Sequence, residues 1–184
     1  MPAESPSPTG SWTAYDAVGE ADLAVLRLTG LSVPVRGAEL AKIEDSFDAP
    51  RDGGRRHDAV DILAPRGTAI VAATDGVILR IGTNALGGNV VWMGDADQRF
   101  AYYYAHLERY ARGITTGSRV SRGAVLGYVG TSGNAPPDVP HLHFQVMRVT
   151  DTKRWWDGMP VNPFPFLVEP GSVATNASPR APWQ

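Results

Sequence analysis

The stretch from His141 to Met147, with the sequence His-Leu-His-Phe-Gln-Val-Met, predicts a β-strand because it is rich in aromatic and aliphatic residues. Side chains two positions apart share one face of a strand, at a spacing of roughly 6.6 Å. His141 and His143 are therefore expected to face one cavity, but they stand rather far apart to bind one ion together. The spacing favours one of them as a metal ligand and the other as an outer or substrate-facing imidazole.

All four histidines of the chain lie in three short motifs, at residues 57–61, 104–106 and 141–143. In the first motif, Asp61 follows His57 by four positions. A flat strand would separate the two by about 13 Å, which is too far to share an ion, and the neighbouring glycines and proline do not favour a helix. A loop that bends into a strand is the better interpretation. Imidazole nitrogen and carboxylate oxygen are ligands that zinc accepts, and a catalytic zinc keeps three protein ligands and an open position.

The composition is that of an ordinary globular protein. The chain has 184 residues, 43% hydrophobic and 20% charged, enough for one domain with a real core. The net charge of −2 argues against nucleic-acid binding. The chain has no cysteine, which excludes disulfides and thiolate metal sites. No stretch is apolar enough to span a membrane, and no signal peptide is visible, so the protein is either cytosolic or a mature form whose export signal has been removed.

Residues 1–14 are rich in Pro and Ser and predict a flexible leader, residues 15–168 a single domain, and residues 169–184 a mobile tail. Phe47 is a candidate buried anchor, and Asp75-Gly76 is a hairpin signal. Residues 151–167 are expected to cover a sheet edge. Short strands are expected at 59–63, 69–73, 77–81, 89–93, 99–105, 119–120, 125–129 and 141–149. This pattern predicts an all-β fold, mainly an antiparallel sheet or sandwich, with loop-rich termini.

From residue 47 to residue 167 the chain resembles the M23 metallopeptidases, the LytM- or lysostaphin-like cell-wall endopeptidases. The motifs that carry the resemblance occur in the family's order: His57-Asp-Ala-Val-Asp61, Ala64-Pro-Arg-Gly-Thr68, Asp75-Gly-Val-Ile78, Gly87-Gly-Asn89, Tyr104-Ala-His-Leu107, Gly127-Tyr-Val-Gly-Thr-Ser-Gly-Asn134, His141-Leu-His-Phe144 and Asn162-Pro163. Each motif alone is weak, but eight in order are specific. One departure is Ala59, where the family often has glycine.

The resemblance implies a LytM-like β domain that holds one zinc ion through His57, Asp61 and His143. It implies that His106 and His141 stay off the metal and face the substrate. The implied activity is zinc-dependent cleavage of peptide bonds in peptidoglycan, and the implied location is the cell envelope or the exterior. A non-catalytic LytM-like regulator of cell-wall hydrolases is the alternative, although such proteins usually lack one or more of these ligands.

In the implied mechanism, the metal activates water and the two other histidines assist, one as general base and one as donor to the oxyanion or leaving amine. The sequence does not assign the two roles, and it identifies neither the bond cleaved nor the oligomeric state. Three further residues are candidates for substrate binding, each with a structural alternative: Tyr104 on the same strand as His106, Asn89 after two glycines, and Asn134 in a glycine-rich loop. Arg51, Arg55 and Arg56 form either a surface loop or a grip on a substrate carboxylate.

Overall fold

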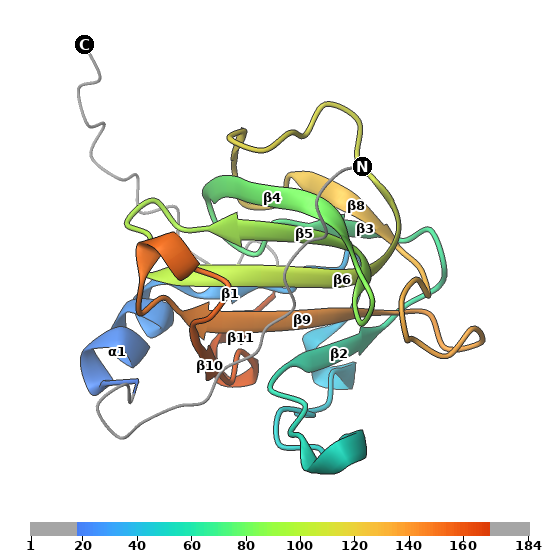
Figure 1. Cartoon of the computed structure of the whole chain (residues 1–184), viewed down its shortest axis with the longest axis horizontal. Coiled ribbons are helices and arrows are strands. Elements are labelled where there is room, and N and C mark those ends of the chain that lie inside the picture. Colours follow the sequence, from blue (N-terminus) through green and yellow to red (C-terminus); the bar gives the residue numbers. More distant parts are fainter. Residues whose placement is uncertain (1–17, 170–184) are drawn as a thin grey trace.

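The computed structural model describes residues 18–169 (Figure 1). The expected leader at residues 1–14, and all of the expected tail except Glu169, lie outside the described residues. None of the helices within residues 18–169 is long and apolar enough to cross a membrane.

Nine strands within residues 18–169 form one sheet in which every pairing is antiparallel. The main path runs β10-β9-β6-β5-β4-β7, β2 also pairs with β9, and β8 joins β3 to β6. The strands are β2 (Val60–Leu63), β3 (Ala69–Val71), β4 (Gly76–Asn84), β5 (Gly88–Gly94), β6 (Phe100–Tyr110), β7 (Arg119–Val120), β8 (Val125–Val129), β9 (His141–Arg148) and β10 (Met159–Val161). The expected all-β, mainly antiparallel fold is confirmed.

Strand β6 is the centre of the sheet, and its side chains alternate between two apolar layers. Tyr102 and Tyr104 belong to the main core, whereas Ala101, Tyr103 and Ala105 belong to a smaller cluster on the other face. Successive residues of a strand point to opposite faces, so an almost wholly apolar strand can be buried on both. Trp155 closes part of the smaller cluster, because its ring packs at 5.0 Å from that of Trp92 on β5.

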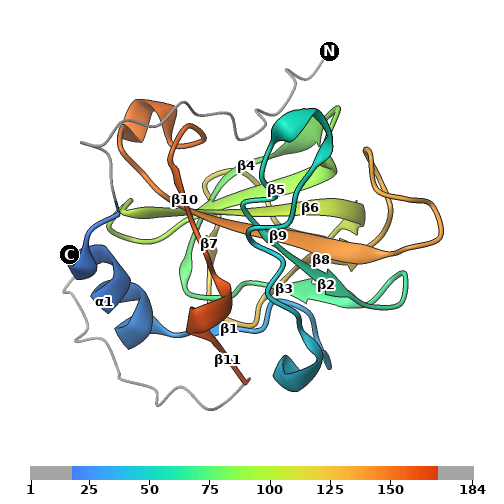
Figure 2. The same ribbon diagram turned by 90° about the horizontal axis from the view of Figure 1, so that it is seen from below.

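The main core is closed by the N-terminal segment. Helix α1 (Glu20–Thr29) buries Leu26, and β1 (Leu31–Ser32) pairs in parallel with β11 (Leu167–Val168). Figure 2 shows α1 and the β1–β11 pair on one side of the sheet and the loop of residues 51–56 on the other. The remaining short 3₁₀ helices are η2 (Leu40–Lys42), η3 (Asp52–Gly54), η4 (Thr152–Arg154) and η5 (Phe164–Phe166). Phe47 is buried, as expected.

The hairpin expected at Asp75-Gly76 is wrong. Strands β3 and β4 on either side of it do not pair, because β3 pairs with β8 while β4 pairs with β5 and β7. The Asp75 carboxylate instead accepts a hydrogen bond of 2.7 Å from the backbone N–H of Arg122, in the turn between β7 and β8. The expected cover over a sheet edge is confirmed, since β10 lies within residues 151–167 and pairs with β9.

Candidate functional site

A cleft of about 1130 Å³ lies over β6 and β9, on the face of the sheet opposite the main core. All four histidines line it. The walls come from three loops: residues 51–58, the turn after β4, and residues 134–139 before β9. The site therefore uses the sheet as a rigid floor and the loops as variable walls.

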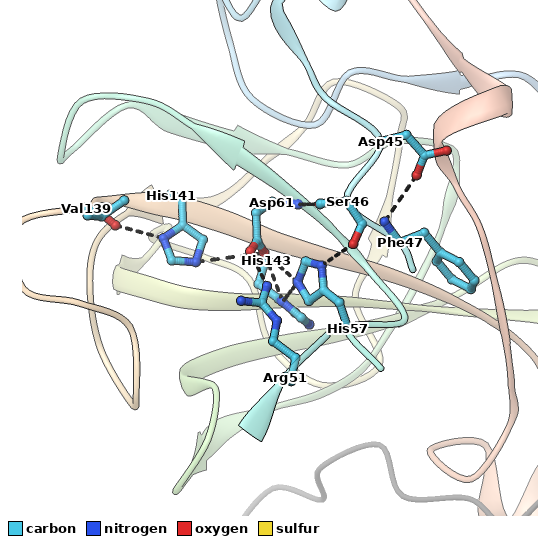
Figure 3. A network of polar contacts seen from close by, with 9 residues as sticks. All are labelled: Asp45, Ser46, Phe47, Arg51, His57, Asp61, Val139, His141 and His143. Carbon is cyan, nitrogen blue, oxygen red and sulfur yellow. Dashed lines mark hydrogen bonds and ion pairs between the residues drawn. The ribbon is translucent and has the colours of Figure 1, made fainter. Parts of the chain in front are cut away.

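Three of the cleft residues, His57, Asp61 and His143, bring their donor atoms together (Figure 3). His57 Nε2 lies 2.9 Å from Asp61 Oδ1 and 3.0 Å from His143 Nδ1. Asp61 Oδ1 and His143 Nδ1 are 3.1 Å apart. Ligands about 2.0–2.1 Å from a tetrahedral zinc are about 3.3 Å from one another. The three atoms thus form nearly one face of such a tetrahedron, and two imidazoles with one carboxylate are a donor set that suits zinc.

Two features of the backbone produce this geometry: a bend at Asp58 and the pairing register of β2 with β9. Asp58 adopts a left-handed backbone conformation (φ 56°), so the chain turns between His57 and the start of β2 at Val60. In β2, Asp61 pairs with His143 of β9. The expected loop bending into a strand is confirmed, and it brings together two residues that a flat strand would hold apart.

Ser46 orients two members of this group, and the sequence analysis missed it. Its backbone carbonyl accepts from His57 Nδ1 at 2.8 Å, which leaves Nε2 with a lone pair toward the other two donors. Its hydroxyl oxygen accepts from the backbone N–H of Asp61 at 3.1 Å. The turn around Ser46 is held by Asp45, whose carboxylate accepts from Asn162 at 2.9 Å. Such outer hydrogen bonds fix ligand orientation and tautomer in metal sites, but no local sequence pattern marks them.

The protonation states suit metal binding. Burial raises the pKa of the Asp61 carboxyl, but hydrogen bonds and charge interactions with His143 and His57 outweigh it and hold that pKa far below its usual range. Burial lowers the pKa of His143, and the adjacent Asp61 only partly offsets this. At neutral pH the site therefore presents an ionised carboxylate and a neutral imidazole, the forms that bind cations.

His106 and His141 lie beside this donor group, and each is held by a hydrogen bond from its ring to a backbone carbonyl. His106 Nδ1 donates to the Ser132 carbonyl and His141 Nδ1 to the Val139 carbonyl, both at 2.8 Å. Each ring therefore keeps an unprotonated Nε2 when neutral. The two rings lie 4.8 Å apart, and His141 Nε2 is 3.9 Å from Asp61 Oδ1. Burial lowers the pKa of His106 to about 4.

His106 enters the cleft because β6 contains a β-bulge. His106 has a φ of +64°. Val91 of β5 pairs with Tyr104 and Asn89 pairs with Leu107, so a step of two residues on β5 corresponds to three residues on β6, which therefore has one extra residue. A bulge breaks the alternation of side chains. Ala105 and His106 consequently both line the cleft, whereas Leu107 returns to the main core.

The bulge makes the prediction for Tyr104 wrong. Tyr104 is completely buried in the main core, where its hydroxyl accepts from the Ala73 N–H at 3.1 Å. Its structural alternative, a core tyrosine, is confirmed. Tyr103 lines the cleft instead, with its hydroxyl accepting from Asn84 at 3.0 Å.

Of the other two candidate substrate-binding residues, Asn134 lines the cleft and Asn89 does not. Asn89 does not line the cleft; its amide donates to the carbonyls of Leu107 at 2.9 Å and of Glu108 at 3.4 Å. It therefore supports the bulge rather than facing a ligand, and the binding prediction for it is wrong. Asn134 does line the cleft, and its substrate contact stays a prediction.

Arg51, Arg55 and Arg56 also line the cleft. Arg51 Nη2 donates to Asp61 Oδ2 at 2.6 Å, so the carboxylate uses one oxygen for the histidines and the other for the guanidinium. Arg56 pairs with Asp58 at 3.3 Å, and its guanidinium stands 5.5 Å above the Phe47 ring.

An antiparallel sheet whose cleft holds a His-Asp-His donor group beside two further imidazoles is suited to metal-dependent hydrolysis. The comparison with known families agrees: residues 55–163 match the model of peptidase family M23, and the chain belongs to that family.

Among curated relatives, the chain is 36% identical over 126 residues to an L-Ala–D-Glu endopeptidase of Bacillus subtilis (65% of this chain, 37% of that one). It is 32% identical over 126 residues to the glycyl-glycine endopeptidase ALE-1 of Staphylococcus capitis (68% of this chain, 33% of that one). The catalytic domain of lysostaphin from Staphylococcus simulans superposes with a TM-score of 0.56 at 27% identity, over 69% of this chain and 93% of that one. The chain spans about a third of the length of the two curated relatives.

Proposed function

We propose that the chain is a zinc-dependent endopeptidase that cleaves peptide bonds in peptidoglycan. The observation that carries the proposal is the group of three donor atoms 2.9–3.1 Å apart, beside two imidazoles that are not part of it. Membership of peptidase family M23 and relatives named as an L-Ala–D-Glu endopeptidase and a glycyl-glycine endopeptidase support the substrate class. These relatives also support an exported or envelope location.

In this proposal His57, Asp61 and His143 hold one zinc ion. When bound, the ion supplies Lewis acidity: it polarises a carbonyl and lowers the pKa of a water molecule. Ser46 keeps His57 in the tautomer that offers Nε2, and β-sheet pairing keeps Asp61 opposite His143.

His106 and His141 move the protons of the reaction. Hydrolysis of an amide needs one group to accept a proton from water and one to donate to the oxyanion or leaving amine. Each of these rings has Nδ1 bonded to a backbone carbonyl and Nε2 available to shuttle a proton. The low pKa of His106 keeps that ring neutral at pH 7 before substrate binds. Exchanging each histidine for Gln and recording which limb of the pH–rate profile disappears assigns the two roles.

The test is release of soluble peptides from purified peptidoglycan by zinc-loaded protein. We expect release that stops on adding a chelator, and mass spectrometry of the fragments then identifies the bond. Asp61→Asn keeps the side-chain shape but removes the charge, and it should abolish release. Asp97→Asn makes the same change at an exposed position outside the cleft and should leave release unchanged. Folded, zinc-loaded wild type that binds wall peptides without cleaving them would overturn the endopeptidase proposal and favour the non-catalytic regulator.

A further inference from the structure

The carboxylate of Asp61 divides its two oxygens between two kinds of partner. Oδ1 faces the imidazoles of the donor group, 2.9 Å from His57 Nε2 and 3.1 Å from His143 Nδ1. Oδ2 instead accepts a hydrogen bond of 2.6 Å from Arg51 Nη2 (Figure 3). A carboxylate can offer a cation either one oxygen or both. The guanidinium therefore leaves Oδ1 as the oxygen of Asp61 that is available to an ion in the donor group.

Arg51 belongs to the same loop that carries His57 into the cleft. The backbone N–H of Arg51 donates to the Arg55 carbonyl at 3.0 Å, which closes the loop across its base. Pro50 forms an isolated antiparallel bridge with Arg56, the residue directly before His57. The backbones of Arg51 and His57 are thus held close together at the base of the loop. The loop itself places Arg51 beside the donor group.

The contact between Arg51 and Asp61 differs from the ion pairs of a neighbouring cleft arginine. Arg56 pairs with Asp48 at 3.2 Å and with Asp58 at 3.3 Å, and neither of these carboxylates belongs to the donor group. The Asp48 side chain is 79% exposed, whereas that of Asp61 is 23% exposed, so water screens the Arg51 contact less. A distance of 2.6 Å is that of a strong charge-assisted hydrogen bond.

The number of carboxylate oxygens that reach an ion affects which ion a site prefers. A catalytic zinc takes three protein ligands and keeps one position open. Mn²⁺ favours octahedral coordination with more oxygen ligands. Two imidazole nitrogens and one oxygen of Asp61 therefore suit Zn²⁺. A second oxygen from Asp61 would add a donor that Mn²⁺ accepts more readily than Zn²⁺ does.

We propose that Arg51 is a positioning residue that limits Asp61 to one metal-facing oxygen and thereby makes the site selective for Zn²⁺ over Mn²⁺. The guanidinium acts through Asp61, whose second oxygen it occupies. This inference rests on the metal-binding part of the proposed function. It concerns metal affinity and coordination, which can be measured without any peptidoglycan.

The test is the ratio of the affinities for Zn²⁺ and Mn²⁺, each measured by competition with a chelator of known affinity. R51M removes every donor of the guanidinium and should lower this ratio about tenfold, a usual size for the loss of an outer hydrogen bond in a metal site. Both ions are dications, so the loss of a nearby positive charge changes both affinities alike and cancels in the ratio. R51K keeps a charged donor and should recover part of the ratio. R51Q, a second neutral variant, should lower the ratio by less than R51M, because its amide can still donate to Oδ2.

Cobalt provides an independent measure of coordination. Tetrahedral Co²⁺ absorbs visible light more strongly than Co²⁺ with five or six ligands, so Co²⁺-loaded R51M should absorb less than Co²⁺-loaded wild type. The matched control is R56M, which makes the same change at a cleft arginine that pairs with Asp48 and Asp58 instead. R56M should leave both the ratio and the spectrum unchanged. Urea unfolding of the metal-free variants checks that each is folded.

A wild-type ratio or a wild-type cobalt spectrum in folded R51M would overturn the proposal. A fall of the ratio in R56M as large as that in R51M would also overturn it, because the effect would then belong to the charge of the cleft and not to the contact with Asp61. A lowered ratio in R51M of a protein that releases nothing from peptidoglycan would uphold this inference and remove the endopeptidase proposal alone.

Discussion

His106 holds a left-handed backbone conformation, and its replacement by alanine and by glycine should have unequal effects on stability. Both substitutions remove the imidazole and its 2.8 Å hydrogen bond to Ser132, so their difference isolates the backbone at φ +64°. Alanine in this region costs about 1–2 kcal/mol, whereas glycine has no such penalty. Glycine loses about 0.5–1 kcal/mol through its greater freedom in the unfolded chain. We therefore expect H106G to be about 0.5–1 kcal/mol more stable than H106A.

The assay is urea unfolding of the metal-free protein at pH 7. With an m-value of about 2 kcal/mol/M, the midpoint of H106G should exceed that of H106A by about 0.3–0.5 M at equal m-values. Ala105→Gly, one residue earlier on β6 and without a positive φ, is the matched control and should be destabilised. Equal midpoints, or a more stable H106A, would show that residue 106 does not hold this conformation in solution. Both His106 variants should lose peptide release, because neither carries an imidazole.

Three further changes probe the site. Ser46→Ala removes the acceptor for the Asp61 N–H and should weaken zinc binding about tenfold in a chelator competition; unchanged affinity would show that the Ser46 hydroxyl does not orient the ligand. Gly87→Ala places a Cβ 2.1 Å from the Tyr103 hydroxyl and should cost about 1–3 kcal/mol in urea unfolding; wild-type stability would contradict this packing. Burial lowers the pKa of His106 from 6.5 to about 4, so between these values the unfolded chain binds a proton that the folded chain does not. Stability of the metal-free protein should therefore fall by up to about 3 kcal/mol as the pH drops through this window, and H106G should lack this part of the pH dependence.

Much of the fold follows from local sequence signals, whereas the full donor group of His57, Asp61 and His143 was implied by the family resemblance. Short apolar runs between Gly and Pro turns indicate antiparallel strands, and the two-residue spacing of His141 and His143 places both rings on one strand face. The same spacing predicts that only one of these two histidines binds the metal ion. The donor group contains His143 and not His141, in agreement with this prediction. Period-two alternation is a local property of a strand, which is why it can be inferred without knowledge of the partner strands.

The errors lie where alternation is interrupted or where partners are distant in sequence. Regular alternation would put Tyr104 and His106 on one face, but the bulge separates them. The amide of Asn89 reaches carbonyls of β6 eighteen and nineteen residues away, and Ser46 meets His57 only after the loop has folded. Such contacts depend on tertiary packing, which no short motif encodes.

The bulge also explains how one residue can serve the site without disturbing the sheet. In a regular strand, Tyr104 and His106 would share one face, so an imidazole in the cleft would bring Tyr104 out of the core. The extra residue confines the change to one position, so Leu107 remains fully buried and pairs with both Asn89 and Val129. The left-handed strain at His106 is then the local cost of placing an imidazole beside the donor group. The hydrogen bonds from Asn89 to Leu107 and Glu108 stabilise the backbone where that cost arises.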